Sequence, residues 1–181
     1  MAHSTRAEDV PKSLEPILTG YEHHDELCHV LASSNLFADL SSQQIETLAK
    51  YVRAFVARTD TPIFLEGSYT GFMCVIIKGR VRVFKDSGGG RSKLLGEAEA
   101  GNSLGEMSMI DGQPHSATAV AVEPVTLITL TREDFTRIVD ENPRLATKIL
   151  WRFTRLISQR LRSTSGMLVD SLDLLTGGKP T

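Results

Sequence analysis

The segment GEMSMIDGQPHSA, residues 105–117, is the most informative part of this sequence of 181 residues. It joins two stretches with β-strand composition and combines a glycine, an acid, a short apolar turn and a Pro-His-Ser-Ala sequence. Gly105 has no Cβ, so the backbone there can approach a ligand closely or adopt an unusual φ. The residues after it can form one turn of helix whose free N–H groups point at negative charge. The segment therefore predicts a site for a small anion.

Two side chains of this segment have the chemistry to recognise a nucleotide. Glu106 is an acceptor for hydrogen bonds from sugar hydroxyls, whereas Ser116 can donate one to a phosphate oxygen. His115 brings one or two donors, and its charge depends on a pKa near neutrality. One short segment can therefore contact both halves of a nucleotide.

Short stretches rich in apolar and β-branched residues lie on both sides of the segment, separated by turns. The predicted strands span residues 54–58, 62–65, 73–77, 81–85, 93–98, 117–122 and 125–130. Two of these strands around Gly79 predict a hairpin, and the last two predict a strand pair that turns at Glu123-Pro124. The predicted fold class is mainly β, an antiparallel jelly-roll barrel with N-terminal helices and a long C-terminal helix.

Helical patterns precede the strands. Residues 1–20 mix prolines and polar residues without a sustained period, and we expect a mobile lead-in there. Residues 21–32 predict a first helix. Ser41 and Gln44 have the capping-box spacing at the start of a second helix, which is expected to run to about Arg53.

Two helices are predicted after the strands. Thr131 has the chemistry of an N-cap for a short helix, and Pro143 suits the first position of a longer one. Residues 163–166, of sequence STSG, are expected to interrupt the longer helix because they are weak helix formers. The predicted organisation is a lead-in at 1–20, a β domain with its helical entry at 21–142, a dimerisation and signal helix at 143–175, and a flexible tail at 176–181.

The segment 105–117 resembles the phosphate-binding cassette of the cyclic nucleotide-binding domains, the sensor fold of the catabolite activator protein family. A strand and turn at residues 63–67 and the glycine turn at residues 77–81 add to the resemblance. It extends from about Leu36 to Leu175. These motifs are moderately specific one by one and highly specific in this order.

The resemblance implies roles for individual residues. Glu106 would accept from the ribose 2′-hydroxyl, and Ser116 with the backbone around Ala117 would hold the cyclic phosphate. A Thr-Ser pair that meets the adenine in the activator protein matches Thr164 and Ser165, whose alternative role is to bond helix carbonyls one turn back. The predicted ligand site comprises Gly105, Glu106, Met107, Ser108, Pro114, His115, Ser116, Ala117, Thr164 and Ser165.

His115 departs from the family, which usually has arginine at this position. Arginine is always charged and offers a planar fork that matches phosphate, which histidine does not reproduce. Four alternatives remain open: weak binding of a cyclic nucleotide, pH-dependent binding, preference for another ligand, or no binding.

The C-terminal helix is expected to form a homodimer. Leu150, Phe153, Ile157, Thr164 and Leu168 lie close to a seven-residue repeat, the period of a two-helix seam. The alternative is that all these side chains pack within one subunit.

Composition excludes several classes of protein. Apolar residues make up 41% and charged residues 23% of the chain, which is ordinary for a soluble domain. A net charge of −2 implies no bulk attraction to nucleic acid. Cys28 and Cys74 have neither metal nor redox spacing. The N-terminus lacks the pattern of a signal peptide, and no apolar run is long enough for a membrane helix, so we expect a cytoplasmic protein without membrane contact.

Arginines along the C-terminal helix are expected to form a solvated face, because no aromatic residues interleave them. The activator family continues into a helix-turn-helix domain, whereas this sequence ends at Thr181. We therefore expect no direct DNA binding.

The sequence thus predicts a sensor that binds cAMP and relays its occupancy through the C-terminal helix to a protein effector. The alternative is a dimerisation or interaction module of the same fold that has lost nucleotide binding, or binds another cyclic nucleotide such as cyclic di-GMP. Catalysis, a metal and a cofactor are not expected, because His115 is the single histidine of the predicted strands and their connections.

Overall fold

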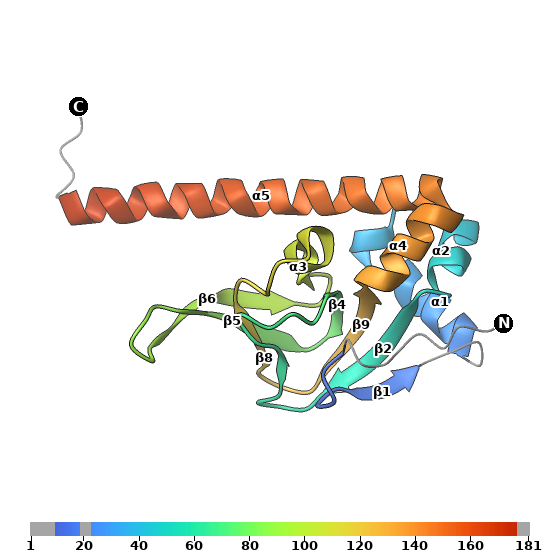
Figure 1. The fold of residues 1–181 in the computed structure, drawn as a ribbon, viewed down its shortest axis with the longest axis horizontal. Coiled ribbons are helices and arrows are strands. Elements are labelled where there is room, and N and C mark those ends of the chain that lie inside the picture. The colour runs from blue at the N-terminus through green and yellow to red at the C-terminus, as the bar shows by residue number, and fades with distance from the viewer. Residues whose placement is uncertain (1–9, 19–22, 177–181) are drawn as a thin grey trace. The chain divides into compact units, whose positions relative to one another are not determined.

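The computed structural model describes residues 10–18 and 23–176, and the chain divides into two compact units (Figure 1). The first unit, residues 1–146, contains the sheets and the shorter helices. The second unit, residues 147–181, contains most of the long C-terminal helix. The division falls a few residues after Pro143, where we expected the boundary.

Two antiparallel sheets build the first unit, which confirms the predicted jelly-roll class. The five-stranded sheet runs in the order β1 (Glu15–Leu18), β2 (Val52–Ala57), β9 (Val125–Thr131), β4 (Phe72–Lys78) and β7 (Ser103–Leu104). The four-stranded sheet runs in the order β3 (Pro62–Phe64), β8 (Thr118–Ala121), β5 (Arg80–Asp86) and β6 (Ser92–Glu99).

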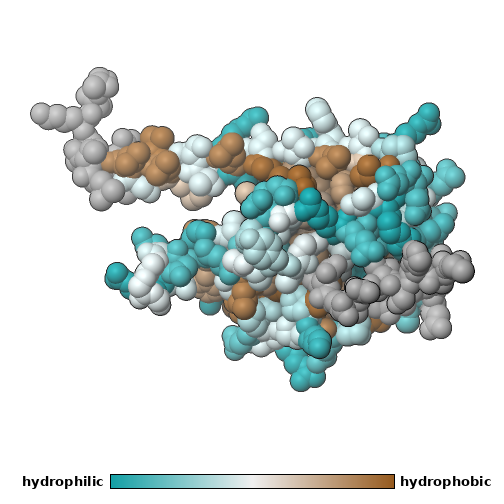
Figure 2. Space-filling model, in the orientation of Figure 1, coloured by the Kyte–Doolittle hydropathy of each residue, from teal (hydrophilic) through white to brown (hydrophobic). Residues whose placement is uncertain are grey.

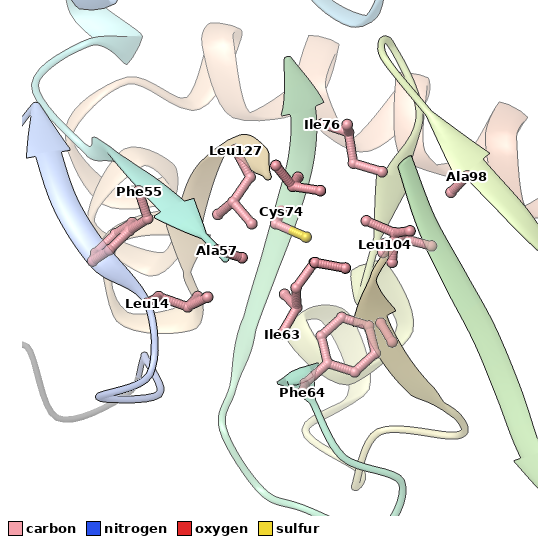
Figure 3. Close-up of a cluster of buried hydrophobic side chains, with 14 of the residues drawn as sticks. Leu14, Phe55, Ala57, Ile63, Phe64, Cys74, Ile76, Ala98, Leu104 and Leu127 are labelled. Carbon is pink, nitrogen blue, oxygen red and sulfur yellow. The ribbon is translucent and has the colours of Figure 1, made fainter. Parts of the chain in front are cut away.

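A hydrophobic core lies between the sheets. Figure 3 shows side chains from both sheets pointing toward one another, among them Ile63, Cys74 and Leu127, which are all fully buried. Residues 72–76 of β4 are buried on both faces of the strand, which explains why that part of the sequence is a continuous apolar run rather than an alternating one.

The expected hairpin around Gly79 and the expected pair before and after Pro124 are both wrong. The strands β4 and β5 belong to different sheets, and so do β8 and β9. At each turn the chain crosses from one sheet to the other, and the two turns pack together. A Cβ on Gly79, whose φ is 93°, would lie 2.6 Å from the carbonyl oxygen of Pro124. Apolar alternation predicts each strand but does not show which sheet it joins.

The part of the predicted lead-in that the structure describes is ordered. Val10 and Leu14 are buried in the core, at 6% and 3% exposure, and β1 pairs with β2. The expectation of a mobile lead-in is therefore wrong for residues 10–18. Residues 1–9, 19 and 20 lie outside the described residues.

The N-terminal helices are α1 (His24–Ser33), the short 3-10 helix η3 (Asn35–Phe37) and α2 (Ser42–Leu48). The capping box is confirmed, since Ser41 and Gln44 exchange hydrogen bonds between side chain and backbone. The prediction that α2 reaches Arg53 is wrong, because the strand β2 begins at Val52. The predicted start of the first helix at Tyr21 lies outside the described residues.

The helix α4 (Arg132–Glu141) begins at the predicted N-cap, since the Oγ1 atom of Thr131 accepts from the Asp134 N–H at 3.1 Å. The helix α5 (Pro143–Thr176) begins at the predicted proline. It continues through residues 163–166, so the expected interruption is wrong. The Ser165 hydroxyl donates a hydrogen bond to the Leu161 carbonyl one turn back, at 2.8 Å. The serine side chain is therefore satisfied inside the helix.

The predicted tail after α5, residues 177–181, lies outside the described residues. Within the described part of the chain, no helix combines the length and the apolar character needed to cross a bilayer.

Candidate functional site

The segment 105–117 begins with a tight turn between β7 and the short helix α3 (Glu106–Asp111). Gly105 has a φ of 85°, the left-handed conformation that favours glycine. A Cβ at this position would lie 2.7 Å from the Phe72 carbonyl oxygen and 3.2 Å from the Cε1 atom of His115. The turn therefore requires glycine for two reasons, its backbone conformation and the close approach of β4.

Glu106 follows this turn and is buried, with 2% of its surface exposed. The hydroxyl of Ser103, on β7, donates a hydrogen bond to one of its carboxylate oxygens. Ser108 is also buried, whereas Met107 between them is 53% exposed. The hydroxyl on β7 thus holds the acid in place. An ionised carboxylate is an acceptor of the kind that a ligand hydroxyl can use.

The imidazole of His115 points into the barrel core and is only 3% exposed. Its ring stacks on Phe64, with centroids 4.0 Å apart, and meets Phe72 edge-on. Its Nε2 atom lies 2.7 Å from the Thr70 hydroxyl. Burial lowers the pKa of His115 to about 4, so the ring is uncharged at neutral pH. In this geometry His115 does not supply the positive charge that arginine carries in the family.

The backbone of His115 forms one side of a paired turn. Its carbonyl accepts from the Gly67 N–H at 2.9 Å, and its own N–H donates to the Ser68 carbonyl at 3.0 Å. Ser116 follows and is exposed, between the buried residues His115 and Ala117. This pairing leaves the Ser116 side chain accessible to a ligand. Pro114, before the turn, is half-buried.

The Lys85 ammonium lies beside this turn. The sequence did not identify this lysine as a site residue. The Nζ atom of Lys85, on β5, lies 2.7 Å from the Ser116 carbonyl oxygen and 2.5 Å from a carboxylate oxygen of Glu66. The Asp86 N–H donates to the other oxygen of Glu66 at 2.8 Å. Both hydrogen bonds lower the pKa of Glu66. The bond from the Asp86 N–H has the larger effect, followed by the bond from Lys85.

A weak signal for Lys85 is present in the sequence. It lies two residues after Val83 and four after Val81, at the spacing that places strand residues on one face. Val81 is fully buried and Val83 packs against the core. Lys85 is therefore the last, polar residue on the face of β5 whose earlier residues pack in the core. Neither the row nor its spacing identifies Glu66 or Ser116 as a neighbour.

Thr164 and Ser165 lie on α5, in the second unit, and both are exposed. The other predicted site residues all lie in the first unit, at the N-cap of α3, on α3 and on the turn that follows it. The residues assigned to ribose and phosphate thus lie in one unit, and the two base-contact candidates lie in the other.

Two antiparallel sheets closed around a core, with a short helix and a turn inserted between β7 and β8, form a jelly roll. Residues 55–142 match the family model described as a cyclic nucleotide-binding domain. This part of the chain belongs to that family.

Similar proteins include regulators. The cyclic AMP receptor protein of Thermus thermophilus is 30% identical, over 73% of this chain and 59% of its own length. A cAMP-dependent protein kinase regulatory subunit of Pyricularia oryzae is 28% identical, over 72% of this chain and 39% of its own. The chain thus spans less than two thirds of either relative.

Among solved structures, a cyclic nucleotide-binding domain from Methylobacillus flagellatus is similar to this chain with a TM-score of 0.76. It is 28% identical, and the match covers 88% of this chain and 89% of that one. The chain is therefore related, as a regulatory cyclic nucleotide-binding domain, to the receptor protein and the kinase regulatory subunit.

Proposed function

We propose that the segment 105–117 binds cAMP and that the chain acts as a regulator rather than as an enzyme. One observation carries the proposal: the segment presents a buried, fixed carboxylate at one end and an exposed serine at the other. The first suits a ribose hydroxyl and the second a phosphate oxygen. The names of the two relatives, a cyclic AMP receptor and a cAMP-dependent kinase subunit, support cAMP as the nucleotide.

Each residue of the predicted site except the buried His115 has a proposed role. Glu106 accepts from the 2′-hydroxyl, and Ser116 donates to the cyclic phosphate together with backbone N–H groups around Ala117. Gly105, Met107, Ser108 and Pro114 shape the segment. Thr164 and Ser165 contact the base, by analogy with the activator protein.

A homodimer through α5 is the second part of the proposal. Figure 2 shows hydrophobic side chains along this helix, and Leu161, Leu168 and Leu172 are 66%, 60% and 50% exposed. They recur at intervals that keep them on one face, as in a two-helix seam. Thr164 lies between them on the same side, so a seam would place the proposed base contact next to a second copy.

The proposed relay of ligand occupancy to a protein effector depends on the contact between the base and α5. A ligand shifts a helix only by the difference in its affinity for the two helix positions. Contact of the base with Thr164 or Ser165 would provide this difference.

The burial and neutrality of His115 favour a second candidate function. Without the family arginine, a same-fold module would dimerise and bind an effector without a cyclic mononucleotide, or would take another ligand such as cyclic di-GMP. Nucleotide titrations separate the two candidates.

The test is calorimetric titration of the wild-type chain with cAMP, cGMP and cyclic di-GMP. We expect saturable binding of cAMP, weakened roughly tenfold or more in Glu106→Gln, which keeps the side-chain shape but loses the charge of the acceptor. Glu99→Gln, an exposed change on β6, is the matched control and should bind like the wild type. Binding of none of the three nucleotides would favour the interaction module.

A further inference from the structure

The strand register brings a lysine to the phosphate end of the segment. The strands β5 and β8 are paired as far as Phe84 with Thr118, so Lys85 is the next residue along β5 beside Ala117. The Lys85 ammonium reaches the Ser116 carbonyl oxygen at 2.7 Å. Any anion that the Ser116 hydroxyl holds would lie within reach of the same ammonium.

Glu66 forms an ion pair with this ammonium. The side chains of Lys85 and Glu66 are 47% and 25% exposed, so the pair lies at the surface, open to a ligand. An ammonium has three donors, and two of them serve Glu66 and Ser116. A phosphate oxygen can therefore join the pair or replace Glu66 as the acceptor.

The side chain of His115 does not supply a cation for the phosphate. The His115 ring is buried against Phe64 and Phe72, away from the exposed Ser116 side chain. Lys85, by contrast, places a charged donor in hydrogen-bond contact with the turn.

We propose that Lys85 replaces the family arginine as the cationic ligand of the phosphate, and that Glu66 is an internal anion which competes with the nucleotide for it. The proposal rests on the proposed function, since it names the charge partner of the same site. It explains how the segment can keep an anion site although His115 stands where the family has arginine.

Two opposite effects on affinity follow. Loss of the ammonium removes a charge-assisted contact, so Lys85→Met should weaken cAMP binding roughly tenfold. Loss of the competing charge should strengthen it, so Glu66→Gln should tighten cAMP binding several-fold. Glutamine keeps an acceptor for the Asp86 N–H, which limits the structural effect of this change.

The experiment is calorimetric titration of wild type, Lys85→Met and Glu66→Gln with cAMP and with adenosine, which has the ribose and base but no phosphate. Both changes should alter cAMP affinity and leave adenosine affinity unchanged. Lys50→Met, an exposed lysine after α2, makes the same change in net charge and should bind like the wild type. Lys85→Arg should restore binding of cAMP.

The outcomes separate this inference from the function on which it rests. If wild type binds cAMP and Lys85→Met binds it equally well, Lys85 is not a phosphate ligand, although cAMP binding stands. If Glu66→Gln binds cAMP no more tightly than wild type, Glu66 does not compete. This second variant keeps Lys85, so it also tests the contact if Lys85→Met folds poorly. If wild type does not bind cAMP, the proposed function is wrong and this inference with it.

Discussion

The imidazole ring of His115 lies parallel to the phenyl ring of Phe64, with an interplanar angle of 8° and a centroid distance of 4.0 Å. This stack turns the histidine into part of the hydrophobic core. The position that carries the phosphate-binding cation elsewhere in the family thus contributes to packing in this chain, and the proposed cation comes from β5.

Acid should destabilise the chain through His115. Its folded pKa of about 4 lies below the unfolded value near 6.5, so protons bind the unfolded state more readily. The stabilisation is complete above about pH 6.5 and is lost as the pH falls toward 4. Its full size is roughly 3 kcal/mol.

Urea denaturation at about pH 7 and about pH 4.5 measures this loss. His115→Phe retains the stack on Phe64 but does not titrate, so its stability should fall less over the same interval. Equal losses in the two proteins would show that His115 is not the group responsible. The comparison removes the contribution of carboxylates, which titrate in both proteins.

Gly105→Ala should destabilise the turn before α3. The new Cβ would lie 2.7 Å from the Phe72 carbonyl oxygen, and the residue would be held at a φ of 85°. We expect a loss of about 2 to 3 kcal/mol in the free energy of unfolding. Gly101→Ala is a matched control, because Gly101 has a φ of 90° but no atom within 4 Å of a Cβ. Gly101→Ala therefore measures the cost of the backbone conformation alone. An equal loss of stability in both variants would contradict the predicted clash with Phe72.

Leu14→Ala tests whether the segment before α1 belongs to the core. Leu14 is 3% exposed, so its truncation should cost about 2 to 4 kcal/mol of stability. Ile17→Ala, at a side chain that is 43% exposed in the same segment, should cost much less. Thermal or urea unfolding gives both values. A mobile segment would instead tolerate both changes equally.

Introducing charge on α5 should separate the proposed homodimer. Leu161→Glu combined with Leu168→Glu places acids at two exposed apolar positions, where the seam would bury them. Light scattering after size-exclusion chromatography should give about twice the chain mass of 19.9 kDa for wild type and the mass of one chain for the variant. Ser163→Glu is the control. A wild-type chain that stays monomeric at high concentration would rule out the seam.

Local signals in the sequence predicted local structure well. The capping box of Ser41 and Gln44, the N-cap Thr131 and the proline start at Pro143 all depend on residues a few positions apart, and all three are confirmed. Gly105 was predicted for the same reason, since a missing Cβ is visible in the sequence itself.

Contacts between distant segments were not predictable. The sequence did not show that Gly79 and Pro124 lie at adjacent crossings between two sheets, or that His115 turns inward onto Phe64. The contact of Lys85 with Ser116 depends on the register of β5 against β8. A single sequence shows which faces are apolar, but it does not show which faces meet.

A titration cycle measures whether the Glu106 carboxylate accepts a hydrogen bond from the ribose of a bound cyclic nucleotide. Wild type and Glu106→Gln are each titrated with cAMP and with 2′-deoxy-cAMP, which lacks the hydroxyl that Glu106 would accept from. We predict that wild type prefers cAMP roughly tenfold and that Glu106→Gln has lost most of this preference. Equal affinity of wild type for the two nucleotides, or an undiminished preference in Glu106→Gln, would show that Glu106 does not bind the ribose hydroxyl.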